Sequence, residues 1–135
     1  MKNFNHFILV GDEKNWYTAL SKKIWGFSEK RKGFWNTLEV DDKIVFYVTL
    51  PIRKIIGFGK VKKKYIGNDL LFRDEINFGR LLWKYRFNFQ IEFLVQKWEN
   101  GILPPTNIIL NVGRKPISDE IFQNIKKLML EKEKI

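Results

Sequence analysis

The chain has 135 residues, no cysteine and a formal net charge of +10. This length predicts a single domain over residues 1–135, large enough to bury a core. The lack of cysteine excludes disulfides, thiolate metal sites and cysteine nucleophiles and favours a reducing, cytoplasmic setting, and no apolar run reaches the roughly 18 residues of a membrane span.

Strand and helix signals alternate in the first third of the chain. Residues 4–10 predict a strand, and residues 13–23 predict a short helix with Trp16 and Leu20 on one buried face. We expect residues 24–27 to begin a loop that continues through the polar, basic stretch at residues 28–33.

The rest of the chain is dominated by strand signals. Residues 43–49 and 54–61 predict strands, with Gly57 and Gly59 marking a bulge. Residues 85–93 alternate between apolar and polar side chains, and residues 107–112 predict one more short strand.

A helix closes the chain, with Ser118 as its N-cap. Its predicted apolar stripe consists of Ile121, Phe122, Ile125, Leu128 and Met129. This order of elements predicts a mixed α+β domain built around a curled, barrel-like sheet.

Signals for catalysis and for metal or cofactor binding are weak. His6 is the only histidine and lies in a predicted strand, where packing explains it better than acid–base chemistry. The acidic pairs Asp41-Asp42 and Asp74-Glu75 are best explained as turns. Residues 57–60 lack the Gly-Lys-Ser/Thr ending of a phosphate loop. We therefore expect a binding protein that is not an enzyme and carries no metal or cofactor.

Positive charge is concentrated in one third of the chain, because residues 20–64 hold 12 basic and 4 acidic side chains. Such a cluster favours binding to a phosphate backbone, although a solvated surface explains charge runs as well. The candidate phosphate-binding residues are Lys22, Lys23, Lys30, Arg31, Lys32, Arg114 and Lys115. The run at residues 60–64 would be divided between two faces of a strand.

Several short segments follow one another in an order that identifies a family resemblance. They are Lys14-Asn15-Trp16, Ile24-Trp25-Gly26-Phe27, Asn36-Thr37-Leu38 and residues 40–48. This order resembles the EVE family, with Asp41 where the family typically has glycine. Residues 56–61, 83–87 and 117–120 resemble later segments of the same family, so the likeness extends over nearly the whole chain.

The resemblance implies a PUA-like fold, a small curled β-barrel with flanking helices. The related YTH domains bind methylated adenine in RNA, and EVE-like domains are associated with modified bases in DNA, including in restriction systems. It therefore implies a DNA or RNA partner carrying a modified base, and a role within a larger restriction or RNA-processing system.

A base that leaves its stack needs aromatic walls and polar groups for its edge. We predict Trp25 and Trp83 as walls, Asn15 and Ser28 as polar contacts, and Tyr47 as a further hydroxyl. Core packing is the alternative for both tryptophans, and a helix cap is the alternative for Asn15. The remaining tryptophans are interpreted as packing or surface residues: Trp16, Trp35 and Trp98.

Three other functions are compatible with this pattern. The chain could bind unmodified, structured RNA through the same fold, or sense a free nucleobase or another small molecule. A small nuclease is the third alternative, although the sequence offers no cluster of metal ligands.

Overall fold

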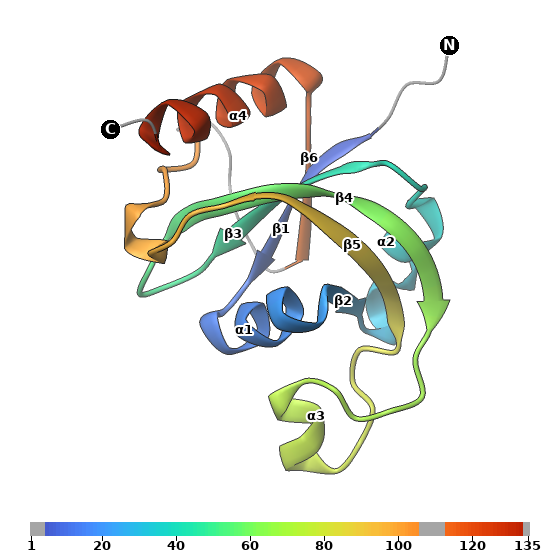
Figure 1. Cartoon of the computed structure of the whole chain (residues 1–135). Helices are drawn as coiled ribbons and strands as arrows, with labels where there is room; N and C mark the ends of the chain where they lie inside the picture. The colour runs from blue at the N-terminus through green and yellow to red at the C-terminus, as the bar shows by residue number, and fades with distance from the viewer. Residues whose placement is uncertain (1–4, 106–112, 134–135) are drawn as a thin grey trace.

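The computed structural model describes residues 5–105 and 113–133, and its centre is a six-stranded sheet in the order β2-β5-β4-β3-β1-β6 (Figure 1). The strands are β1 (His6–Gly11), β2 (Ile24–Phe27), β3 (Lys43–Val48), β4 (Lys54–Ile66), β5 (Tyr85–Leu94) and β6 (Gly113–Ile117). The helices are α1 (Glu13–Lys22), α2 (Lys32–Thr37), α3 (Arg73–Phe78) and α4 (Asp119–Glu133), with 3-10 turns η1 (Glu29–Arg31) and η2 (Trp98–Asn100). β1 and β3 pair in parallel, and the other neighbouring strands pair antiparallel.

The sheet curls because β4 is long and its pairing is interrupted. Its register with β3 shifts opposite Gly57, and its register with β5 shifts next to Gly59. A side chain at Gly59 would collide with the carbonyl group of Gln90, so the two strands approach closely only because this residue is glycine. The predicted bulge is confirmed, and the sheet bends around α1 (Figure 1).

Helix α1 lies inside this bend and anchors its concave side. Trp16 and Ala19 are fully buried, and Trp16 Nε1 donates a hydrogen bond to the carbonyl oxygen of Tyr47 at 2.8 Å. Asp12 caps the start of α1, and Lys23 ends it in the left-handed conformation. The helix predicted over residues 13–23 and its buried face are therefore confirmed.

Helix α4 covers the opposite side of the sheet from α1 (Figure 1). Ser118 Oγ accepts a hydrogen bond from the Ile121 N–H, which confirms the predicted N-cap. Phe122, Ile125 and Met129 are buried, but Leu128 is 49% exposed, so the predicted apolar stripe is narrower than expected. No helix within residues 5–105 or 113–133 is long and apolar enough to span a membrane.

Three predictions about the elements are wrong. Residues 24–27 form β2, since pairing with β5 supplies the hydrogen bonds that a loop would lack. Residues 28–33 form η1 and the start of α2 instead of an extended loop. Asp74 and Glu75 belong to α3, not to a turn. The strand predicted over residues 107–112 lies outside the described residues, and β6 was not predicted.

Candidate functional site

A cavity of about 310 Å³ opens between the β1–α1 turn, β2 and the segment that connects β4 to β5. Its volume reaches the lower end of the range for small-molecule sites, roughly 300–1,000 Å³. The lining residues are Val10, Gly11, Asp12, Asn15, Trp25, Gly26, Phe27, Ser28, Arg31, Thr49, Phe72 and Trp83.

Four aromatic residues line this cavity: Trp25, Phe27, Phe72 and Trp83. Trp25 is only 7% exposed, and its ring centroid lies 4.4 Å from that of Trp16, so the indole belongs to the core and to the cavity at once. Phe72 meets Trp83 edge to face, with ring centroids 5.5 Å apart and planes at 83°. The ring of Trp25 fits here because Gly11 has no side chain. A Cβ atom at that position would lie 2.5 Å from the Cη2 atom of Trp25.

Asn15 supplies the most informative polar atom of the cavity. Its backbone N–H donates to the Asp12 side chain at 2.9 Å as part of the helix cap, which leaves the amide side chain free for other contacts. The Oδ1 atom of Asn15 is buried and has no hydrogen-bond partner in the part of the chain that the structure describes. Buried polar atoms are nearly always paired, so an unpaired acceptor beside a cavity marks a place where a ligand would donate a hydrogen bond.

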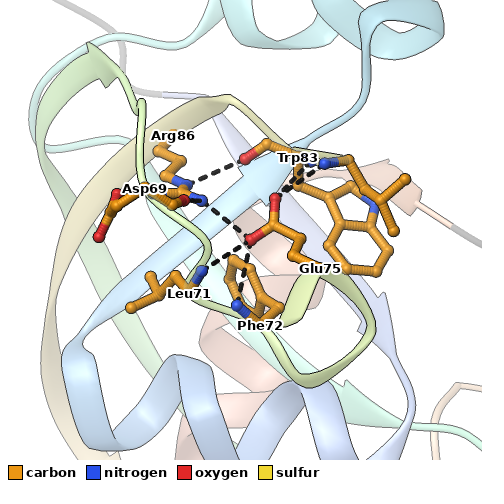
Figure 2. A network of polar contacts seen from close by, with 7 residues as sticks. Asp69, Leu71, Phe72, Glu75, Trp83 and Arg86 are labelled. Carbon is orange, nitrogen blue, oxygen red and sulfur yellow. Dashed lines mark hydrogen bonds and ion pairs between the residues drawn. The ribbon is translucent and has the colours of Figure 1, made fainter. Parts of the chain in front are cut away.

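A buried carboxylate holds the segment that carries two of the rings (Figure 2). Glu75 Oε1 accepts the N–H groups of Leu71 and Phe72, and Glu75 Oε2 accepts those of Leu82 and Trp83. Burial by itself would raise the pKa of Glu75, but these backbone hydrogen bonds outweigh it and lower the pKa below its ordinary value. Glu75 therefore fixes the backbone of both Phe72 and Trp83.

Arg86 completes this network from β5 (Figure 2). Its guanidinium group is fully buried and donates to Glu75 Oε1 at 2.9 Å and to the Trp83 carbonyl oxygen at 3.0 Å. It also donates to the carboxylate and the backbone carbonyl oxygen of Asp69, at 2.6 and 2.7 Å. The alternation of β5 predicted that Arg86 would be exposed, and that expectation is wrong because the 67–84 segment folds over its side chain.

Four of the five residues predicted for the base pocket line this cavity: Asn15, Trp25, Ser28 and Trp83. The fifth, Tyr47, is not among the lining residues. Tyr47 is buried in β3, where its carbonyl oxygen accepts a hydrogen bond from Trp16 Nε1. Phe72 was not predicted, since nothing near it in the sequence indicates that α3 folds back toward Trp25.

The predicted phosphate-binding residues are more dispersed. Arg31 lines the cavity, and Lys30 and Lys32 lie beside it in η1 and α2. Lys22 and Lys23 are exposed at the other end of β2, with Lys23 about 16 Å of extended chain from Ser28. Arg114 and Lys115 are neighbours in β6, so their side chains point to opposite faces of the sheet.

His6 and residues 57–60, which were weighed for catalysis and for phosphate binding, both lie in strands of the sheet. The His6 ring packs against Phe122, with Nε2 3.1 Å from an oxygen of Asp119. Residues 57–60 lie inside β4. Within residues 5–105 and 113–133, no three histidine or acidic residues are grouped closely enough to hold a metal ion.

Solved structures with the same fold include YTH domains and ASCH domains. The YTH domain of Mmi1, in complex with RNA, has a TM-score of 0.62 at 12% identity over 96% of this chain and 79% of its own. The YTH domain of Zygosaccharomyces rouxii MRB1, in complex with N6-methyladenosine RNA, has a TM-score of 0.60 at 15% identity over 95% and 85%. ASCH from Zymomonas mobilis has a TM-score of 0.63 at 12% identity over 91% and 94%.

These likenesses confirm the predicted fold class, a PUA-like α+β domain with a curled sheet and flanking helices. No protein-family model matches the sequence, and no protein of curated function is similar to it in sequence.

Proposed function

We propose that this chain is a nucleic-acid-binding reader of the EVE type, which accepts an extruded, methylated base in the aromatic cavity and has no catalytic role. One observation carries the proposal: four aromatic residues line a cavity of ligand size that also holds a buried amide oxygen with no hydrogen-bond partner among the described residues.

The cavity has the parts that base recognition requires. Trp25, Phe72 and Trp83 offer apolar surfaces for a flat heterocycle, and stacking on such rings contributes about 1–3 kcal/mol per base. Asn15 Oδ1 would accept an N–H group from the base edge. A buried methyl group adds roughly 0.8 kcal/mol, or about a fourfold preference over the unmodified base.

Two further observations support a nucleic-acid ligand. Among the solved structures of the same fold are YTH domains in complex with RNA, one of them N6-methyladenosine RNA. Arg31 lines the cavity, and Lys30 and Lys32 flank Arg31 in the chain, where a phosphate backbone would follow an inserted base. Their role in phosphate binding, and a partner within a restriction or RNA-processing system, stay predictions.

The test compares single-stranded oligonucleotides that differ only by one methyl group on cytosine or adenine. We expect the methylated strand to bind more tightly, and Trp83→Ala to weaken it by about 1–3 kcal/mol of binding free energy, measured by fluorescence polarisation. Trp98→Ala is the matched control, because Trp98 stacks on Tyr17 outside the cavity. Trp25 is better replaced by phenylalanine, since alanine would leave a void beside Trp16.

Each alternative function gives a different result in this test. Equal affinity for matched methylated and unmethylated strands, with loss on Trp83→Ala, would indicate a reader of unmodified RNA. Equal affinity for a free nucleobase would indicate a small-molecule sensor, and cleavage of the strand would indicate a nuclease. If Trp83→Ala and Trp98→Ala bind every strand as the unaltered chain does, the cavity is not the binding site.

A further inference from the structure

A second cavity, of about 320 Å³, lies at the opposite end of β1 from the aromatic cavity. It forms where β6 pairs with β1 and where α2 ends against both strands. Its lining residues are Asn5, His6, Phe7, Thr37, Arg114, Pro116 and Ile117. Among the described residues, no acidic side chain lines this cavity, and Arg114 is its cation.

The cation is Arg114, and its surroundings hold it firmly in place. Its guanidinium carbon lies 5.2 Å from the centre of the Phe7 ring and 4.7 Å from that of the Phe34 ring. Nη1 donates to Thr37 Oγ1 at 3.1 Å. Cation–π contacts with two rings and the hydrogen bond to Thr37 together restrain the guanidinium group.

One donor of the guanidinium group, Arg114 Nε, is buried and has no hydrogen-bond partner within residues 5–105 and 113–133. The buried carboxylate of Asp42 acts on it electrostatically, and its two oxygens accept the backbone N–H groups of Asn5 and Glu39. Burial lowers the pKa of Arg114, yet a guanidinium group stays charged in proteins, so a buried positive charge with a free donor remains. A planar oxyanion or phosphate would satisfy that donor.

Phe34 connects this cavity to the aromatic one. The guanidinium carbon of Arg31, which lines the aromatic cavity, lies 5.8 Å from the centre of the same Phe34 ring that Arg114 stacks on. The two guanidinium groups are therefore separated by no more than a few stacked nucleotides, at roughly 3.4 Å of rise per nucleotide. A strand that places a base beside Arg31 would have a phosphate within reach of Arg114.

We propose that the second cavity is an oxyanion site in which Arg114 binds a backbone phosphate of the strand whose base occupies the aromatic cavity. The strand then crosses the ring of Phe34 between the two sites. This inference rests on the proposed function for its source of phosphate, whereas the oxyanion site itself rests only on Arg114 and its neighbours.

The test follows the Nε–H signal of Arg114 by NMR while one of two ligands is added: inorganic phosphate or a short single-stranded oligonucleotide. We expect the oligonucleotide to shift the signal, and Arg114→Gln to lower the affinity for it about tenfold, the effect of one charge-assisted hydrogen bond. Lys115→Gln is the matched control. Lys115 was predicted to bind phosphate together with Arg114, but its exposed side chain points to the opposite face of β6 and is not among the lining residues of either cavity. Its replacement removes the same charge and should change affinity less than twofold.

The possible outcomes separate this inference from the proposed function. If Arg114→Gln binds as Lys115→Gln does and the signal of the unaltered chain does not move, the inference is overturned while base binding stands. A shift with inorganic phosphate alone, while the oligonucleotide binds without a shift, overturns the path of the strand. If no oligonucleotide binds, the proposed function fails, and the phosphate titration alone decides whether an oxyanion site exists. Should Arg114→Gln fail to fold, the titration of the unaltered chain gives the answer.

Discussion

At Asn15, ligand binding and stability make opposite demands on one side chain. The amide oxygen is buried without a partner, which costs about 1–3 kcal/mol, and asparagine is a weaker helix former than alanine. We therefore predict that Asn15→Ala leaves the free energy of unfolding unchanged or raises it by about 1 kcal/mol, while affinity for a methylated oligonucleotide falls about tenfold. Urea unfolding and fluorescence polarisation measure the two effects.

Thr18→Ala on the same helix is the control for Asn15→Ala. Its hydroxyl group donates only to the Lys14 carbonyl oxygen and does not line the cavity. A loss of stability in Asn15→Ala, with binding retained, would mean that Asn15 serves the fold and not a ligand.

Glu75 is the residue on which the position of two cavity rings depends. Its carboxylate accepts four backbone N–H groups and one guanidinium N–H, so glutamine would place an N–H₂ group against donors. We predict that Glu75→Gln lowers the free energy of unfolding by about 3 kcal/mol, as for other broken buried pairs. Asp74→Asn, which removes the adjacent and partly exposed carboxylate bonded to Lys14, should cost less than about 1 kcal/mol.

The unaltered chain and Glu75→Gln should also differ in how their free energy of unfolding depends on pH. The pKa of Glu75 is lowered in the folded chain, so its contribution to stability is complete above the unfolded value of about 4.3. That contribution is lost as the pH falls from there through the folded pKa. The difference in unfolding free energy between the unaltered chain and Glu75→Gln should therefore shrink below about pH 4. A constant difference down to pH 2 would contradict this account.

At the scale of elements, patterns with a clear period were predicted well and short ones were not. Helix α1 and strands β3 and β5 have long, regular apolar patterns, and the structure confirms them. Strand β2 has four residues, including Gly26, which is too few for an alternation to be distinct. It becomes a strand only because β5 pairs with it, and that tertiary contact is absent from its local sequence.

Gly26 shows how β2 and the 67–84 segment share the aromatic cavity. An added Cβ would lie 2.7 Å from the carbonyl oxygen of Trp83 and 2.9 Å from its Cβ. We predict that Gly26→Ala displaces Trp83 and lowers affinity for the methylated strand at least about tenfold, with a stability loss of about 1–3 kcal/mol from overpacking. Titrations monitored by tryptophan fluorescence and urea unfolding would measure both effects.

Gly33→Ala is the matched control, because nothing lies within 4 Å of a Cβ at this position in α2. Alanine there should raise the unfolding free energy by about 0.5–1 kcal/mol, since glycine is unfavourable inside a helix. Unchanged binding by both glycine variants would show that close packing of β2 against Trp83 has no part in recognition.

The whole molecule explains why the sequence predicted part of the site and missed the rest. Asn15 and Trp25 belong to segments that resemble the EVE family, and Ser28 follows the second of these segments, so the three could be predicted together. Phe72, Glu75 and Arg86 act through a segment that folds back from the end of β4. Their side chains meet only through the tertiary fold. In addition, the sequence pattern of an alternating strand is the same whether an arginine such as Arg86 is buried or exposed.

The distribution of charge over the molecule determines how binding should respond to salt. The net charge is +10, and Lys30 and Lys32 lie beside the aromatic cavity, whereas Lys126 and Lys127 lie on α4 across the sheet (Figure 1). We predict that affinity for a single strand falls steeply between about 50 and 200 mM salt, because bound lysines release counterions from phosphates. Isothermal titrations over a series of salt concentrations would measure this slope.

Two double variants then distinguish local binding from overall charge, since each removes two positive charges. Replacing Lys30 and Lys32 by glutamine should reduce the slope of log affinity against log salt by about 0.7 for each phosphate that is no longer neutralised. Replacing Lys126 and Lys127 by glutamine should leave the slope unchanged, because charges beyond a Debye length of about 10 Å are screened. Equal reductions in the two variants would show that the strand is attracted by the net charge of the molecule and not held beside the aromatic cavity.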